Sequence, residues 1–413
     1  MPDASSSTAD VLIVGGGAAG LVAAVFAARA GARTVLLEKT RRGGKKIVVS
    51  GGGRCNVLPS VVDERLFVTD SSRRLMGRVL ASWPLPEQRR FFEDDLGVPL
   101  ALEEETGKLF PASDRATDVR DALVDAARQA GADLRFEADV VSLDADTDGW
   151  TARLRDGPAV TARAAVVATG GLSVPKTGSD GFGLRLAERL GHRVEPTYPA
   201  LAPLTAAPAP HADLAGVAVP HAHVRVPLAK GAFETSGGFL FTHRGYSGPA
   251  VLNVSHLTAL GRARGEAPEV RVAWTPDAPD AWEAALREPG RGLVASTLRQ
   301  TLPTRLADRL LADADVPADR ARADLRRDER RRLVDALTAY PLPWTGDEGY
   351  KKAEVTGGGI GLGEVDPRTL ESRHHAGLHF AGEVLDAFGP IGGYNFFWAW
   401  ATGRLAGRGA AAL

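Results

Sequence analysis

The segment from Ala9 to Lys39 constrains the fold of this chain more than any other, because it places a glycine motif directly behind an apolar strand. Val11 to Val14 are apolar throughout, as a parallel strand buried on both faces requires. Gly15, Gly17 and Gly20 follow in the spacing G-x-G-x-x-G. These glycines allow a tight turn, a close approach of the backbone to a pyrophosphate, and close packing of the next helix on the sheet.

The helix predicted after these glycines, over Ala18–Ala30, would direct its free amide groups and the positive end of its dipole toward a phosphate. A second strand is predicted over Thr34–Leu37, and Glu38 follows it. A carboxylate at this position accepts hydrogen bonds from a ribose 2'-hydroxyl and repels a 2'-phosphate. The segment therefore predicts an AMP-containing dinucleotide as the ligand, either FAD or NAD.

Two further segments are expected to approach the same ligand. Residues 41–57, RRGGKKIVVSGGGRCNV, hold two glycine clusters and two lysines, which favour a cradle for a second phosphate or for a ribityl chain. The alternative is a glycine-rich turn without a ligand. A buried strand over Ala164–Ala168 runs into Thr169, Gly170 and Gly171, so the chain is expected to pass the dinucleotide a second time.

The end of the chain favours FAD over NAD. A short buried strand over residues 377–383 ends at Glu383, whose carboxylate can accept a hydrogen bond from a ribityl hydroxyl. An apolar helix is predicted to start near Gly393. Its amide groups and partial positive charge would face the flavin atoms N1 and O2, where the reduced ring carries negative charge.

Composition divides the chain into a cofactor domain and an insert. Residues 1–196 and 353–413 are predicted to form an α/β Rossmann-type domain built from both chain ends. Residues 197–278 are rich in Pro and Val in short alternating segments, which predicts a β-rich part on the substrate side. Residues 279–352 predict a helical part, and its arginines alternate with acidic residues as on a solvated helix face.

Charge and cysteine content limit the partners. The net charge is −1, so no global field favours nucleic acid or an anionic membrane. The single cysteine, Cys55, suits a reducing cytosol, and no signal peptide or membrane-spanning run is evident. The scattered histidines have no spacing that completes a metal site. We therefore expect a cytoplasmic protein that acts on a small molecule, without nucleic acid, membrane or metal; the oligomeric state is left open.

Motifs over nearly the whole length resemble the bacterial flavoprotein family that includes YhiN, the BaiN-type proteins and the aminoacetone oxidases. The resemblance is carried by GGGAAGLVAA, KKIVVSGGGRCN, KLFPASDRATDV, ATGGLSVPKTGSDGFGLRLAERLGH, YPALAPL, FTHRGYSGPAVLNVS, EVTGGGIGLGEVDPRTLES and GLHFAGEVLDAFGPIGGYNFFWAWATG, in the family's order. It implies an FAD-binding Rossmann domain interrupted by the insert. One departure is Val57-Leu58-Pro59, where the family has a polar Thr-Asn near the expected flavin site.

The resemblance also implies a set of cofactor contacts. Together with the last glycine of the motif, they are Gly15, Gly17, Ala18, Ala19, Gly20, Glu38, Lys39, Lys46, Ser50, Gly51, Gly53, Arg54, Val140, Thr169, Gly170, Gly382, Glu383, Gly392, Gly393, Tyr394 and Asn395.

The predicted activity is that of an FAD-dependent oxidoreductase, in two versions. An oxidase would pass electrons from an amine-type donor to oxygen. A reductase would take hydride from transiently bound NAD(P)H and deliver it to an enone-like acceptor. His243 and Tyr246 in the insert are candidate proton-transfer groups, although both could merely shape an interface. An RNA-modifying flavoprotein and a flavin-bound sensor without turnover are the alternatives.

Overall fold

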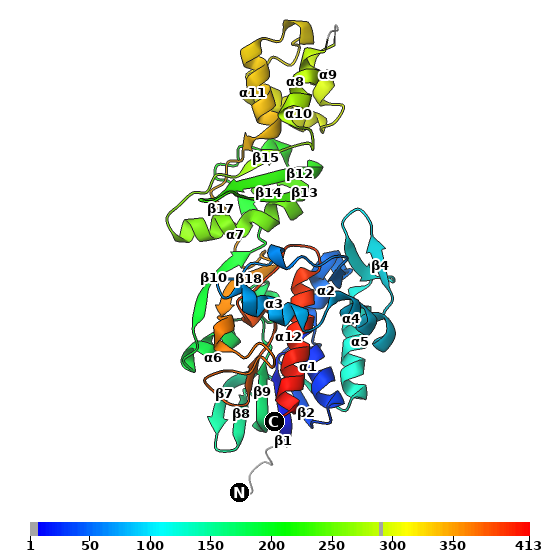
Figure 1. Ribbon diagram of the computed structural model, residues 1–413, viewed down its shortest axis with the longest axis vertical. Coiled ribbons are helices and arrows are strands. Elements are labelled where there is room, and N and C mark those ends of the chain that lie inside the picture. Colours follow the sequence, from blue (N-terminus) through cyan, green and yellow to red (C-terminus); the bar gives the residue numbers. More distant parts are fainter. Residues whose placement is uncertain (1–6, 289–291) are drawn as a thin grey trace. The chain divides into compact units, whose positions relative to one another are not determined.

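The structure, a computed structural model, describes residues 7–288 and 292–413. The described chain forms two compact units (Figure 1). The first contains the described residues up to Thr197 together with Val355–Leu413, and the second is Tyr198–Glu354. The first unit is therefore built from both chain ends, and the second lies between them in the sequence.

A mostly parallel sheet organises the first unit. Its central strand, β1 (Ser7–Val14), lies between β2 (Thr34–Glu38) and β9 (Val160–Val167) and runs parallel to both. The chain passes from β1 to β2 on one side and returns as β9 on the other, so the order of the strands reverses between β1 and β9. Ligands of open α/β sheets bind at such a reversal, beyond the carboxyl ends of the strands.

The remaining strands extend this sheet and form two smaller ones. The sheet is extended in parallel by β6 (Asp133–Phe136) and β19 (Leu378–Phe380) and in antiparallel by β7 (Val140–Asp146) and β8 (Gly149–Leu154). The smaller sheets consist of β3 (Leu58–Pro59), β5 (Lys108–Pro111) and β4 (Leu100–Glu103), and of β10 (Val194–Ala200) with β18 (Val355–Ile360).

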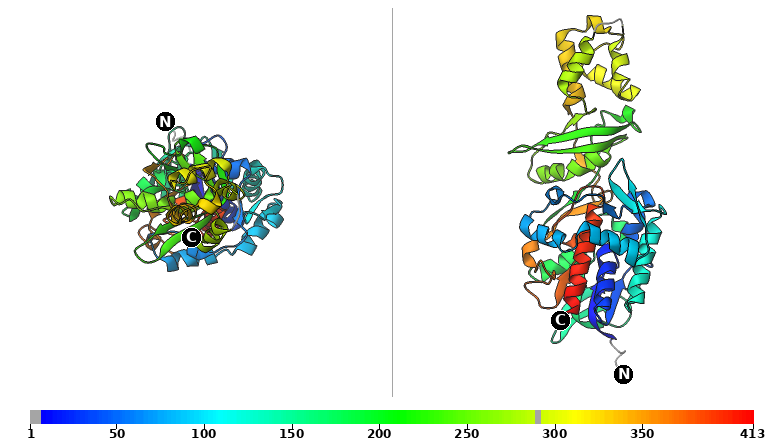
Figure 2. Two further views of the ribbon diagram at one scale, coloured as in Figure 1. Left: turned by 90° about the horizontal axis from the view of Figure 1, so that it is seen from above. Right: turned by 45° about the vertical axis from the view of Figure 1, so that its right-hand side comes forward.

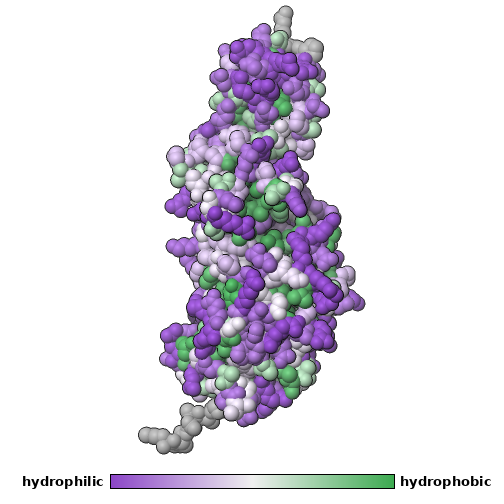
Figure 3. Space-filling view, turned by 60° about the vertical axis from the view of Figure 1, so that its left-hand side comes forward, coloured by the Kyte–Doolittle hydropathy of each residue, from purple (hydrophilic) through white to green (hydrophobic). Residues whose placement is uncertain are grey.

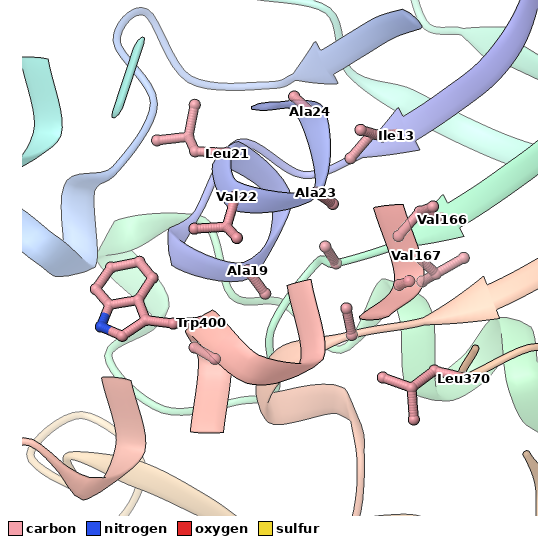
Figure 4. Close-up of a cluster of buried hydrophobic side chains, with 14 of the residues drawn as sticks. Ile13, Ala19, Leu21, Val22, Ala23, Ala24, Val166, Val167, Leu370 and Trp400 are labelled. Carbon is pink, nitrogen blue, oxygen red and sulfur yellow. The ribbon is translucent and has the colours of Figure 1, made fainter. Parts of the chain in front are cut away.

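Two helices from opposite chain ends pack closely on one another. Helices α1 (Ala18–Arg29) and α12 (Tyr394–Ala411), blue and red, lie side by side in Figure 1 and in the right-hand view of Figure 2. A Cβ atom at Gly403 would lie 2.4 Å from the carbonyl oxygen of Ala19. One at Gly407 would lie 2.4 Å from that of Ala23, so only glycine allows this approach. Figure 4 shows part of the apolar core around this contact.

The other α-helices of the first unit pack on α12, on one another or on strands. They are α2 (Lys45–Val49), α3 (Arg73–Ala81), α4 (Leu85–Arg90), α5 (Ala116–Gln129) and α6 (Phe182–Arg189). Helix α4 continues into a π-helical turn over Phe91–Asp95.

The apolar pattern of Leu134–Leu143 predicts one strand, and this prediction is wrong. The structure has two strands there, β6 and β7, separated at Glu137, whose φ is +57°. The amides of Glu137 and Ala138 donate instead to the carbonyl oxygens of Thr40 (3.2 Å) and Glu38 (3.0 Å). These bonds bring the start of β7 to the end of β2, where the predicted ligand would lie.

The second unit joins an antiparallel sheet and a helical group around one hydrophobic core. The sheet contains, in order, β16 (Tyr340–Pro341), β15 (Arg271–Ala273), β12 (Ala218–Pro227), β13 (Ala232–Thr242), β14 (Gly245–Ser247), β11 (Leu204–Thr205) and β17 (Gly346–Asp347). The helical group is α8 (Pro279–Arg287), α9 (Val294–Leu298), α10 (Thr304–Asp313) and α11 (Arg327–Thr338). Helix α7 (Pro249–Ala263) packs on β12 and β13, within a segment predicted to be β-rich and without helical period.

The described residues contain neither a membrane-spanning helix nor a metal-binding cluster. Within residues 7–288 and 292–413, no helix is long and apolar enough to cross a membrane. The same residues contain no group of three or more His, Cys, Asp or Glu side chains that could hold a metal ion. The face in Figure 3 mixes hydrophilic and hydrophobic residues.

Candidate functional site

The carboxyl edge of the parallel sheet brings together the predicted cofactor contacts from distant parts of the sequence. Strands β1, β2, β9 and β19 run in one direction and end at this edge. Each is followed by predicted contacts: Gly15, Gly17, Ala18, Ala19 and Gly20 after β1, Glu38 and Lys39 after β2, Thr169 and Gly170 after β9, and Gly382 and Glu383 after β19. The topology thus places four segments of the predicted site at one edge.

The first glycine loop is shaped to receive a phosphate. Gly17 precedes α1, and neither a capping side chain nor an acidic residue occupies the first turn of that helix. A Cβ atom at Gly17 would meet nothing within 4 Å, whereas one at Gly15 would lie 2.6 Å from the carbonyl oxygen of Ala168. The loop is therefore tight on its protein side and open at the helix N-terminus, where amide groups and the dipole favour an anion.

Glu38 is held in place at the end of β2. Its side chain is nearly buried, with the residue 9% exposed. One carboxylate oxygen accepts from the amide of Gly16 at 2.7 Å and the other from the amide of Thr40 at 2.8 Å. Val140 begins β7 nearby, because Ala138 bonds to the carbonyl of Glu38. This arrangement orients Glu38 as a ribose-binding carboxylate requires.

The second glycine stretch lies against the first glycine loop. Gly44 caps α2 with a φ of +69°, and its amide donates to the carbonyl oxygen of Gly16 at 2.7 Å. Gly51, Gly52 and Gly53 then form an exposed turn with φ of +55°, +68° and +90°. A side chain is strained at such angles, which explains the glycine triplet.

Arg54, Ser50 and Lys39 have protein partners of their own. The guanidinium of Arg54 lies 4.0 Å from the centre of the Phe110 ring and pairs with Glu103 at 3.0 Å. The Ser50 hydroxyl donates to the carbonyl oxygen of Ile47 at 2.7 Å. Lys39 pairs with Asp180 at 2.6 Å.

A polar cluster surrounds Glu383 behind β19. Lys46 Nζ lies 2.6 Å from Glu383 Oε2 and 2.7 Å from the hydroxyl oxygen of Ser173. The other oxygen of Glu383, Oε1, accepts from the hydroxyl of Ser173 and from the amide and hydroxyl of Thr356, at 3.0 and 2.8 Å. Ser173 and Thr356 lie in two of the motifs that carry the family resemblance, but neither is among the predicted cofactor contacts.

The start of α12 is stabilised by its own side chains. Gly392 and Gly393 adopt φ of +130° and +88° before the helix begins. The side-chain amide of Asn395 exchanges two 2.9 Å hydrogen bonds with the backbone of Gly389, and the Tyr394 hydroxyl donates to the carbonyl oxygen of Val61 at 3.0 Å. The helix N-terminus is thus fixed at the sequence position predicted to face the flavin ring.

The departure from the family at Val57-Leu58-Pro59 lies in the core. All three residues are buried. The amide of Val57 donates to Leu109, and its carbonyl oxygen accepts from the indole of Trp400 at 3.0 Å. Burial also raises the pKa of the neighbouring Cys55 thiol to about 12. These residues support the turn into α12 by packing.

The two candidate proton-transfer residues lie in the second unit in different environments. His243 is exposed in the turn between β13 and β14. Tyr246 has an exposure of 0%, and its hydroxyl lies 2.8 Å from Nδ1 of His211. Burial raises the pKa of Tyr246 well above its usual value of 10.0. The proton-transfer role of His243 stays a prediction, whereas Tyr246 belongs to a hydrogen-bonded chain inside the core.

This buried chain connects the sheet of the second unit to its helices. The hydroxyl of Tyr340 donates to Asp313 at 2.7 Å, so it accepts from Nε2 of His211 at 2.8 Å. Nδ1 of His211 then accepts from the hydroxyl of Tyr246. Asp313 pairs with Arg309 at 2.8 Å on the same helix, α10. With His211 neutral, each of these hydrogen bonds has one donor and one acceptor. With the ring protonated, Nδ1 would carry a proton and could no longer accept from the Tyr246 hydroxyl.

We expect the free energy of unfolding of the second unit to fall as pH drops below about 6.5. Burial, and then the charge of Arg309, lower the pKa of His211 from its ordinary 6.5, with Asp313 and Asp213 opposing. The folded state then binds fewer protons, so this stability is complete above pH 6.5 and is lost toward the lowered pKa. Buried His256, with a pKa of about 4, acts in the same direction from pH 6.5 down to about pH 4. Urea unfolding between pH 5 and 7.5 measures this free energy at each pH. It should depend less steeply on pH in His211→Gln than in the original protein, and an unchanged pH dependence would contradict this assignment.

The geometry fits a dinucleotide that carries a ribityl chain. The uncapped N-terminus of α1 suits a pyrophosphate, Glu38 suits a ribose, and the Lys46–Glu383 pair suits a hydroxylated chain. These residues, at the carboxyl edge of the sheet, would hold FAD.

The chain is similar to known proteins over most of its length. The sequence profile described as HI0933-like protein Rossmann domain matches residues 9–409. The chain is 38% identical to ribosomal RNA dihydrouridine synthase of Escherichia coli, over 73% of this chain and 74% of that one. It is 34% identical to 3-dehydro-bile acid delta(4,6)-reductase of Clostridium scindens, over 87% of this chain and 88% of that one.

Solved structures share the fold. An open conformation of a flavocytochrome c3 fumarate reductase aligns with a TM-score of 0.51 at 16% identity, covering 99% of this chain and 79% of the other. Sdh1 of Mycobacterium smegmatis, in complex with UQ1, aligns with a TM-score of 0.51 at 18% identity, covering 98% of this chain and 69% of the other.

Proposed function

This chain belongs to the HI0933-like Rossmann family of FAD-dependent oxidoreductases, and we propose that it is a reductase of carbon–carbon double bonds conjugated with a carbonyl group. The observation that supports this version over an oxidase comes from the relatives. Dihydrouridine is uridine with such a bond saturated, and a 3-dehydro bile acid with delta-4,6 unsaturation contains the same conjugated unit. The two names therefore denote one kind of reaction on different molecules.

The described residues support this chemistry by binding and orientation. FAD, when bound, supplies hydride transfer, which protein side chains cannot perform. The open first turn of α1, the carboxylate of Glu38 and the Lys46–Glu383 pair would hold the dinucleotide. NADH or NADPH would supply two electrons as a transient reductant, and the acceptor would gain one hydride and one proton.

A small, free enone is the first candidate substrate, because the whole chain has a net charge of −1 and RNA-binding proteins depend on a basic surface. A uridine in ribosomal RNA is the second candidate. It is favoured by the 38% identity to the Escherichia coli dihydrouridine synthase.

Anaerobic stopped-flow spectroscopy of the FAD-loaded protein tests the proposal. We expect NADH or NADPH to bleach the flavin absorbance, and a 3-keto steroid with a conjugated double bond to restore it. The saturated 3-keto steroid is the matched control and should restore nothing. Ribosomal RNA fragments with uridine, compared with the same fragments carrying dihydrouridine, test the second substrate. Bleaching by aminoacetone and by neither nicotinamide would instead support the oxidase.

A further inference from the structure

Thr356 occupies a central position in the polar cluster behind β19. It is 2% exposed, and its hydroxyl donates to Glu383 Oε1 at 2.8 Å. The hydroxyl oxygen of Thr356 also accepts hydrogen bonds from the amides of Leu172 at 2.7 Å and Ser173 at 3.1 Å. A Cβ atom at Gly171 would lie 2.4 Å from this hydroxyl, so the loop after β9 is docked directly on Thr356. One side chain thus ties that loop to Glu383.

The hydrogen bonds around Glu383 use its two oxygens unequally. Oε1 accepts three, from the amide and hydroxyl of Thr356 and from Ser173. Among the described residues, Oε2 accepts one hydrogen bond, from Lys46. A carboxylate oxygen can accept more than one hydrogen bond, so Oε2 retains capacity for a ligand. The ammonium of Lys46 likewise uses two of its three donors, on Glu383 and Ser173.

We propose that Thr356 is a positioning residue for the flavin: by fixing Oε1 of Glu383 it turns Oε2, beside Lys46, toward a hydroxyl of the ribityl chain. A hydroxyl both donates and accepts, so it matches the spare acceptor of Oε2 and the spare donor of Lys46. The pair does not suit a phosphate, because the negative charge of Glu383 balances the positive charge of Lys46 and the carboxylate itself repels an anion. The inference concerns cofactor binding and therefore holds for a reductase and an oxidase alike.

Titration of the apoprotein with FAD, followed by flavin fluorescence, tests this role. Thr356→Val keeps the shape of the side chain and removes the hydroxyl, and we expect a Kd for FAD that is about 10-fold higher or more. Thr356→Ser keeps the hydroxyl and should restore the Kd to within about 3-fold of the original. FAD analogues that each lack one ribityl hydroxyl should locate the contact. The original protein and Thr356→Val should bind one of these analogues with equal Kd, namely the analogue that lacks the hydroxyl contacted by Glu383.

Thr34→Val is the matched control. Thr34 is equally buried in the first unit, and its hydroxyl donates to Ala32 at 3.0 Å at the start of β2, the opposite end from the site. This variant should leave the Kd for FAD unchanged. The proposal is overturned if Thr356→Val binds FAD like the original protein, if Thr356→Ser fails to restore binding, or if every analogue shows the same penalty for Thr356→Val.

Discussion

Replacing Gly403 by alanine is expected to lower the free energy of unfolding of the first unit by about 3 kcal/mol or more. The added methyl group would overlap the backbone of α1, 2.4 Å from the carbonyl oxygen of Ala19. A backbone carbonyl inside a close-packed helix pair cannot turn away as a side chain can, so the two helices must separate. Urea unfolding monitored by tryptophan fluorescence measures the loss, because Trp398 and Trp400 are buried on α12.

Gly77→Ala is the control for this substitution. Gly77 also lies within a helix, α3, but a Cβ atom there would meet the end of the Glu64 side chain, 2.8 Å away, which can move. We expect this variant to match or slightly exceed the original stability, because alanine favours helix over glycine. Equal unfolding midpoints for Gly403→Ala and Gly77→Ala would show that the α1–α12 contact is not as close as described.

Replacing Glu383 by alanine is expected to raise the Kd for FAD by about 100-fold or more. The substitution removes the ion-pair partner of Lys46 and the acceptor of the Ser173 and Thr356 hydroxyls. It also deletes the carboxylate predicted to bind the ribityl chain. Isothermal titration of the apoprotein with FAD measures the effect directly.

Glu364→Ala provides the comparison. The Glu364 side chain is 21% exposed against 16% for Glu383, and it also lies in the first unit, paired with His374 and with the amide of Arg193. Its loss should affect stability and leave the Kd for FAD within about 3-fold, since its partners, His374 and Arg193, lie outside the cluster around Glu383. Equal losses of affinity in the two variants would remove Glu383 from the cofactor site.

The part of the fold that could be predicted from sequence is the part that depends on local patterns. The Ala9–Lys39 unit appears in the structure as β1, α1 and β2, ending at Glu38 as predicted. The buried strand that ends before Thr169 is β9, and the helix after Gly393 is α12. A strand buried on both faces and a glycine turn leave signals within a few residues.

Other elements were missed because their conformations depend on distant neighbours. Helix α7 begins in a Val- and Pro-rich context and is largely buried, so it shows no polar face in the sequence. The break between β6 and β7 at Glu137 exists because two amides bond to the end of β2. Pro249 at the start of α7 is a local helix-start signal, but the break at Glu137 depends on the neighbouring strand.

The sequence by itself determined that residues 9–39 form a dinucleotide-binding unit and that Glu38 and Glu383 follow strands, at positions where we predict contacts to cofactor hydroxyls. Only the tertiary structure decided how Glu383 is held, because Lys46, Ser173 and Thr356 come from three other segments. The close contact of α1 with α12 was likewise hidden, since it depends on which faces of two helices meet. A strand or turn is set by neighbouring residues, whereas the direction of a carboxylate is set by donors that folding alone assembles.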